Sequence, residues 1–180
     1  DYRQGDAGSY KGGSKLISFF GRVNYSLLDR YMLTATLRRD GSSRFGENHK
    51  WGVFPSVSFA WRISEEPFMA STHEWLDNLK LRAGFGVTGN QNGIGEYKSL
   101  SILSAAGSAY YDGATNTWKN SYTQIQNPNP DLKWESTAQW NLGVDFSVFN
   151  KLNGTLELYY KKTSDLLWTY PVPQPPYLVG

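Results

Sequence analysis

Cysteine is absent from the 180 residues of this sequence, which excludes disulfide bonds and metal sites with cysteine ligands. Long apolar runs are also absent: no stretch of about 18 apolar residues exists, so no membrane-spanning helix is predicted. A strong charge of one sign is lacking too. The formal net charge is +2 and charged residues make up 19%, a balance that argues against a nucleic-acid partner. These absences still allow a strand-built membrane protein, because such strands leave no long apolar run.

Aromatic residues and glycine are plentiful instead. Tyr, Phe and Trp together form 16% of the sequence, and 18 residues are glycine. From Trp140 to Val148 the apolar residues fall on every second position, with Asn141, Gly143 and Asp145 among the residues between them. This alternation predicts a strand with one apolar face and one polar face.

Five further stretches have the same strand character. The predicted strands are about 10 to 15 residues long, whereas strands of globular proteins are most often about five or six residues long. The predicted fold class is therefore all-β, an antiparallel meander. The six predicted strands cover residues 16–27, 30–39, 51–63, 79–88, 134–149 and 154–168.

Short and long connections alternate along this meander. Residues 28–29 and 149–154 predict tight turns, whereas residues 40–50 and 89–133 predict long loops rich in Gly, Ser and Asn. Residues 64–78 form a connection of intermediate length that is predicted to hold a short helix. Outer-membrane barrels show this asymmetry, with short turns on the periplasmic side and long loops outside.

Two architectures fit an alternating strand. In a transmembrane barrel the apolar face meets lipid and the polar face lines a lumen, whereas in a soluble β-sandwich the apolar face packs on a second sheet. The strand length, the sorted loops and the aromatic residues near strand ends favour the barrel. The alternative is a secreted β-sandwich that binds carbohydrate as a module.

Four long segments carry a resemblance to a known family. In order, from about Phe19 to Val172, they resemble the SusC/RagA family of TonB-linked (TonB-dependent) outer-membrane transporters. The segments are FFGRVNYSLLDRYMLTATLRRDGSSRFG, WGVFPSVSFAWRISEEPFM, WLDNLKLRAGFGVTGNQNGIG and NPNPDLKWESTAQWNLGVDFSVFNKLNGTLELYYKKTSDLL.

The resemblance implies a segment of a 22-stranded transmembrane β-barrel in the outer membrane of a Gram-negative cell. Members of the family are plugged by an N-terminal domain and import large nutrients, either glycans or peptides. The implied partners are a SusD-like surface lipoprotein that acts as a lid, the TonB system, which pulls on an N-terminal box, and outer-membrane lipid. The resemblance implies neither an enzyme nor a cofactor.

The chain is expected to be an internal piece of a longer protein. It starts at Asp1 rather than at a methionine, and its last ten residues, PVPQPPYLVG, do not resemble a finished terminus. Residues 1–180 are therefore expected to be a partial barrel of about six strands. The plug, the TonB box and the C-terminal closing strand are expected to be missing from it.

The segment AYYDGATNTWKNSY, residues 109–122, has the composition of a substrate-binding loop. Aromatic rings stack on the apolar faces of sugars, and carboxylate and amide groups bond to hydroxyls. A self-packed loop and a surface for the lid lipoprotein are the alternatives. The candidate substrate-binding residues are Tyr110, Tyr111, Asp112, Asn116, Trp118 and Tyr122.

Three other motifs are interpreted as structural. Residues 40–46 predict a turn in which Arg44 pairs with a nearby carboxylate, and residues 90–93 predict a turn that caps a strand. Residues 127–135 contain two prolines that stiffen the entry into the fifth predicted strand.

No catalytic or metal site is predicted from the motifs. His49 and His73 lie 24 residues apart in unrelated connections, so they do not indicate a metal cluster. No pair of carboxylates is placed together as a glycosidase requires.

Overall fold

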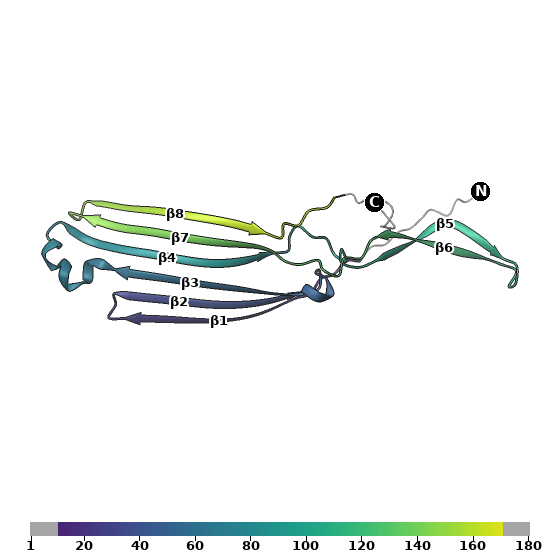
Figure 1. The fold of residues 1–180 in the computed structure, drawn as a ribbon, viewed down its shortest axis with the longest axis horizontal. Coiled ribbons are helices and arrows are strands. Elements are labelled where there is room, and N and C mark those ends of the chain that lie inside the picture. The colour runs from purple at the N-terminus through teal and green to yellow at the C-terminus, as the bar shows by residue number, and fades with distance from the viewer. Residues whose placement is uncertain (1–10, 171–180) are drawn as a thin grey trace.

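The computed structural model describes residues 11–170, except for the side chains of residues 106–109. Six long antiparallel strands form one sheet in the order β1-β2-β3-β4-β7-β8, and a two-stranded sheet, β5-β6, projects beyond one end of it (Figure 1). No helix among the described residues is long and apolar enough to cross a membrane. The strands are β1 (Leu16–Leu27), β2 (Tyr31–Ser42), β3 (Trp51–Arg62), β4 (Leu76–Asn90), β5 (Ile102–Asp112), β6 (Thr117–Gln126), β7 (Glu135–Val148) and β8 (Leu152–Ser164).

The six predicted strands are confirmed as β1, β2, β3, β4, β7 and β8. The prediction of one long loop over residues 89–133 is wrong in its middle, because β5 and β6 form a hairpin there. Most of the described side chains of this hairpin are exposed, and its sequence shows no regular apolar alternation. The predicted short helix between the third and fourth strands is present as two short 3-10 helices, η2 (Ile63–Glu65) and η3 (Pro67–Thr72), and a third, η1 (Glu47–His49), precedes β3.

The connections lie at two different ends of the six-stranded sheet (Figure 1). The end that holds the β1–β2 turn, the β7–β8 turn, η2 and η3 is called the turn end, and the opposite end is the loop end. Leu28 and Asp29, like Phe149 and Asn150, all have φ between 51° and 53°. Two successive residues in the left-handed region form the hairpin turn whose twist matches that of the strands.

The strand register sorts the side chains onto two faces. One row across the whole sheet consists of apolar residues that are directly paired from strand to strand: Tyr25, Leu33, Phe59, Ala83, Leu142 and Leu158. The row beside it, one residue along each strand, is mostly polar: Asn24, Thr34, Ser58, Gly84, Asn141 and Tyr159. We call these two sides of the sheet the apolar face and the polar face.

The apolar face is open. Leu158 is 72% exposed and Val23 68%, whereas such side chains are normally among the most buried. The alternative of a soluble β-sandwich is not supported, because within residues 11–170 no second sheet covers this face.

The polar face carries charges that are paired with one another. Arg82 on β4 donates two hydrogen bonds, of 2.8 and 3.0 Å, to the carboxylate of Asp145 on β7. Thr155 on β8 donates a third to the same carboxylate, over 3.1 Å. Beside this network Gly84 and Gly143 are among the residues that line a hollow of about 320 Å³, where the polar face has room for larger groups.

A buried carboxylate closes the turn end. Glu66, between η2 and η3, accepts hydrogen bonds from the hydroxyl of Tyr31 and from Nε1 of Trp61, the latter over 3.0 Å. Arg30 lies 3.4 Å from its other oxygen. The Tyr31 hydroxyl is the largest cause that holds the pKa of Glu66 below its ordinary value. At the turn end, the polar groups of Tyr31 and Trp61 on the apolar face are thus both bonded to the carboxylate of Glu66.

Candidate functional site

The loop end of the sheet is where the sequence motifs meet. The pairing between β3 and β4 stops at Ser56 and Gly86, although both strands continue beyond that point. Pro55 is the next residue of β3, and it has no backbone N–H for a partner strand. The two strands therefore separate toward the loop end, and side chains from other segments occupy the space between them.

Four buried apolar side chains supply that filling, and we call them the loop-end cluster: Phe45, Phe54, Ile94 and Trp134. The rings of Phe45 and Trp134 have centroids 4.5 Å apart, and Phe54 meets Trp134 edge-on at 5.4 Å. The indole Nε1 of Trp134 donates to the carbonyl of Lys50 over 3.2 Å, so its one polar group is satisfied. The cluster joins the β2–β3 loop to the start of β7.

Backbone contacts reinforce this junction. The amide of Gly46 donates to the carbonyl of Leu132 over 2.9 Å, and the side-chain amide of Asn48 donates to Asp131 over 3.0 Å. A Cβ at Gly46 would lie 1.9 Å from the carbonyl oxygen of Pro130, so only glycine allows the two segments to approach this closely. The two-proline motif of residues 127–135 is therefore structural, as predicted, but its role is to hold one loop against another.

The other two motifs also make contacts within the protein. The prediction that Arg44 pairs with a carboxylate is wrong: its Nη1 donates to the backbone carbonyl of Ile94 over 3.4 Å, and no ion pair of Arg44 is present among the described residues. Residues 90–93 form the expected turn, in which the amide of Asn92 donates to the side chain of Asn90 over 2.9 Å. Asn90 in turn binds Glu135 at the start of β7 over 3.0 Å.

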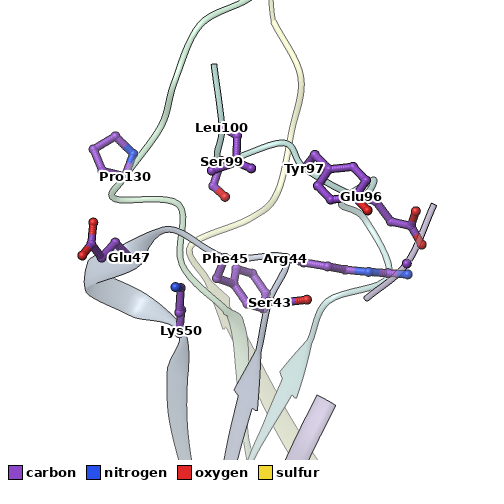
Figure 2. A pocket seen from close by; sticks show the side chains of 11 residues that line it. Ser43, Arg44, Phe45, Glu47, Lys50, Glu96, Tyr97, Ser99, Leu100 and Pro130 are labelled. Carbon is purple, nitrogen blue, oxygen red and sulfur yellow. The ribbon is translucent and has the colours of Figure 1, made fainter. Parts of the chain in front are cut away.

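A hollow of about 330 Å³ lies above the loop-end cluster. Figure 2 shows Glu47 and Lys50 on one side of it and Arg44 and Glu96 on the other. Phe45 and Leu100 contribute apolar surface to the same hollow. The lining thus offers both hydrogen-bond donors and acceptors beside a small apolar surface.

All six predicted substrate-binding residues lie on the β5–β6 hairpin. Tyr111 on β5 is paired directly with Trp118 on β6, and their ring centroids are 5.4 Å apart. Tyr122 lies four residues further along β6, about 13 Å from Trp118. Tyr110 is paired with Lys119, which places it on the opposite face of the hairpin from Tyr111. The four aromatic residues therefore do not form one continuous platform.

The two polar candidates are occupied by contacts within the hairpin. Asp112 pairs with Lys119 and accepts hydrogen bonds from Thr115, over 2.9 Å, and from the amide of Ala114, over 3.1 Å. The Lys119 contact is the main reason that the pKa of Asp112 lies below its ordinary value. Asn116 has φ of 56° in the turn and accepts a hydrogen bond from the Tyr111 hydroxyl.

The aromatic candidates remain accessible, in contrast to the polar ones. Trp118 is 71% exposed, Tyr122 67% and Tyr110 56%. Within residues 11–170 no three His, Asp or Glu side chains lie where they would hold a metal ion. The hairpin therefore presents exposed aromatic rings as its main surface for contact with a ligand.

Sequence comparison identifies relatives of known kind. Residues 1–179 match the family described as TonB dependent receptor-like, beta-barrel. The TonB-dependent receptor SusC of Bacteroides thetaiotaomicron is 42% identical over 172 residues, covering 92% of this chain and 16% of that protein. A TonB-dependent receptor of Formosa agariphila is 43% identical over 160 residues, covering 88% of this chain and 14% of that protein.

Solved structures show the same architecture. The structure of the RagAB peptide transporter superposes with a TM-score of 0.73 at 30% identity, covering 89% of this chain and 17% of that one. The RagAB peptide importer in its open-open state gives a TM-score of 0.75, also at 30% identity, and covers the same shares of the two chains. The chain thus spans only about one sixth of the length of these relatives, which are named as receptors and transporters.

Proposed function

Because this chain belongs to the TonB-dependent receptor-like β-barrel family, as a member similar to SusC and RagA, we propose that it forms part of the barrel wall of an outer-membrane nutrient transporter. The observation that carries this proposal is the open apolar face of the six-stranded sheet. In water such a face is an aggregation surface, whereas in lipid it is the ordinary outside of a barrel. The polar face, with its paired charges, then lines the lumen.

The height of the apolar face supports this placement. Trp51 and Trp61 are ten residues apart on the apolar side of β3, one toward each end of the sheet. Ten residues of a strand span about 33 Å, or about 24 Å across the membrane once the strand tilts by about 45°. The apolar band of outer-membrane barrels is about 25 Å tall and is bordered by aromatic residues.

The sorted connections give the orientation. The turn end, with its three-residue turns, faces the periplasm, and the loop end with its hairpin faces the outside. Residues 1–180 supply about six strands, and the plug, the TonB box and the closing strand belong to other parts of the full-length receptor. The small share of its relatives that the chain covers supports this division.

The hairpin is then the part that meets the nutrient outside the membrane. Tyr111, Trp118, Tyr122 and Tyr110 contact a large glycan or peptide through their ring faces, while Asp112 and Asn116 hold the hairpin in the shape that presents the rings. The exposure of the rings and the internal contacts of the polar pair support these roles. A SusD-like lipoprotein covers the mouth, and the TonB system drives import. The receptor acts by binding and transport and not as an enzyme.

Cell fractionation tests the overall proposal. The full-length receptor should be recovered in the outer membrane and should co-purify with a surface lipoprotein. Recovery as a soluble monomer in the periplasm or medium would contradict the proposal, because the apolar face would then need a protein partner.

Substitution of Trp118 tests the hairpin. Trp118→Ala should weaken nutrient binding by about 1 to 3 kcal/mol if a ring stacks there, by analogy with aromatic stacking on bases, whereas Trp118→Phe keeps a ring face and should retain most of the binding. Binding of candidate glycans and peptides to the purified full-length receptor is measured by calorimetry. If Trp118→Ala leaves nutrient binding unchanged and instead releases the lipoprotein, the hairpin is a surface for the lid.

A further inference from the structure

Charged side chains on the apolar face are confined to the two borders of that face. Within the six strands, and apart from Asp77 in the bulge of β4, the register places only Arg39 and Lys162 on the apolar side. Arg39 lies three residues before the loop end of β2, and Lys162 two residues before the loop end of β8. Both charges are positive, and both stand at the border with the loops.

The turn end has the opposite character. Asp77 accepts a hydrogen bond from the amide of Asn150 over 2.6 Å, and Glu66 is bound by Tyr31, Trp61 and Arg30. These two carboxylates are thus bound by groups of the protein itself. Within the strands, the cations on the apolar face therefore lie at the loop end, and Asp77 at the turn end is held by a backbone amide.

Aromatic rings hold Arg39 at the surface. Its guanidinium carbon lies 4.8 Å from the ring centroid of Trp51, and that ring stacks on Phe19 at 6.2 Å. The Trp51 ring lies across Gly41, where a Cβ would approach it to 2.8 Å. A cation over an aromatic face keeps its N–H donors free for an anion. Among the described residues Arg39 has no carboxylate within ion-pair distance, since the neighbouring Asp40 pairs with Arg38 on the polar face.

Lys162 lies at the same border on the other side of the sheet, on the face that also carries two packed aromatic rings. It follows Tyr160 on the same face, and that ring packs against Trp140 at 5.5 Å. Lys162 is exposed and forms no ion pair with the described residues. Four strand spacings separate it from Arg39, which is about 20 Å or more because β3 and β4 diverge between them, so the two cations meet different ligands.

We propose that Arg39 and Lys162 bind the phosphate groups of anionic lipids in the external leaflet of the outer membrane. The proposal rests on the proposed function, because the loop end must face outside for these cations to reach that leaflet. The acyl chains then lie along the apolar face, and each phosphate meets a cation beside an aromatic ring at the headgroup level. A basic residue near a membrane surface strengthens the binding of anionic lipid by about fivefold.

The sequence offers unusually close control positions. Arg38 and Lys161 are the neighbours of the two cations in the sequence, carry the same charges, and point to the polar face. Arg39→Gln and Lys162→Gln remove a charge from the lipid side, whereas Arg38→Gln and Lys161→Gln remove the same charge from the lumen side. Arg39→Lys keeps the charge at the border.

The test uses the full-length receptor in nanodiscs of phosphatidylcholine, titrated with bisphosphorylated or dephosphorylated lipid A. The native receptor should prefer the phosphorylated form by about fivefold at each of the two sites, and each of Arg39→Gln and Lys162→Gln should remove the preference at its own site. Arg39→Lys should keep it, and the two lumen-side variants should leave it unchanged.

Two results would overturn the proposal in different ways. A receptor that enters the bilayer but has the same preference in the Arg39→Gln, Lys162→Gln double variant as in the native protein would refute the lipid site alone. A native receptor that fails to float with lipid vesicles would refute both the lipid site and the proposed function.

Discussion

Apolar side chains are buried in the loop-end cluster but exposed on one face of the six-stranded sheet. In the cluster, Phe45 is 1% exposed and Trp134 8%, so the protein itself provides their surroundings. On the apolar face, Leu158 and Val23 remain more than two-thirds exposed. The difference shows that, within the part of the chain that the structure describes, the buried apolar cluster lies at the loop end. The apolar face of the sheet has no such cover, and in the proposed barrel lipid would supply it.

The largest effect should come from emptying the loop-end cluster. Phe45→Ala should lower the free energy of local opening by about 3 to 5 kcal/mol, because a buried aromatic ring leaves a cavity. Hydrogen exchange in the full-length receptor should then accelerate in residues 91–101 and 127–134. Phe68→Ala, at a 66% exposed position in η3, is the control and should leave exchange in these segments unchanged. Equal exchange in both variants would show that the cluster does not hold the loops.

A charge on the apolar face should come next. Leu142→Arg places a cation on the apolar face, which meets lipid in the proposed barrel, and should cost about 2 to 4 kcal/mol if the position lies near the midplane. Asn141→Arg, one residue away, enters the hollow of the polar face and should cost much less. Unfolding of the full-length receptor in lipid vesicles measures both. A larger loss from Asn141→Arg would reverse the assignment of the two faces.

A methyl group at the loop junction should have a smaller effect. Gly46→Ala should destabilise the loop end by about 1 to 3 kcal/mol, because the new Cβ would meet the backbone of Pro130. Gly113→Ala adds the same methyl group to the hairpin, where nothing lies within 4 Å of it. Limited proteolysis of the two variants should therefore differ, with faster cleavage only in Gly46→Ala.

The smallest effect should be the pH dependence of the hairpin. The folded hairpin lowers the pKa of Asp112, so the stability that this carboxylate contributes is present above its ordinary pKa and is lost as the pH falls through the lowered value. The fluorescence of Trp118 should report this loosening in acid if the other tryptophans are replaced. Asp112→Asn should abolish the transition, and its persistence in that variant would assign it to another group.

The strands of the six-stranded sheet could be predicted from the sequence because the alternation of apolar and polar residues is a local signal. Neighbouring residues such as Asn141 and Leu142 alternate between polar and apolar, and this alternation indicates a strand with two different faces. The hairpin was missed because its strands, ILSAAGSAYYD and TWKNSYTQIQ, show no apolar period of two. The six candidate residues fall on one hairpin, but Tyr110 and Tyr111 point to opposite faces because they are neighbours on a strand that the sequence did not reveal.

The loop-end cluster could not be predicted for a different reason. Phe45 and Trp134 are 89 residues apart, and Arg44 finds a carbonyl of Ile94 instead of a carboxylate. Such contacts follow from where the separated strands β3 and β4 leave space, which no short stretch encodes. Gly46 and Pro130 were visible in their motifs, yet their close approach is a property of the assembled loops.

The β5–β6 hairpin also has a consequence for the order in which the wall assembles. β4 and β7 are direct neighbours in the sheet, yet residues 91–134 separate them in the chain. Once β5 and β6 have paired, only residues 91–101 and 127–134 still need to close, which is less than half of that length. Each halving of a loop lowers the entropic cost of closure by about 0.6 kcal/mol. The hairpin that reaches outward therefore also shortens the longest step in bringing the strands together.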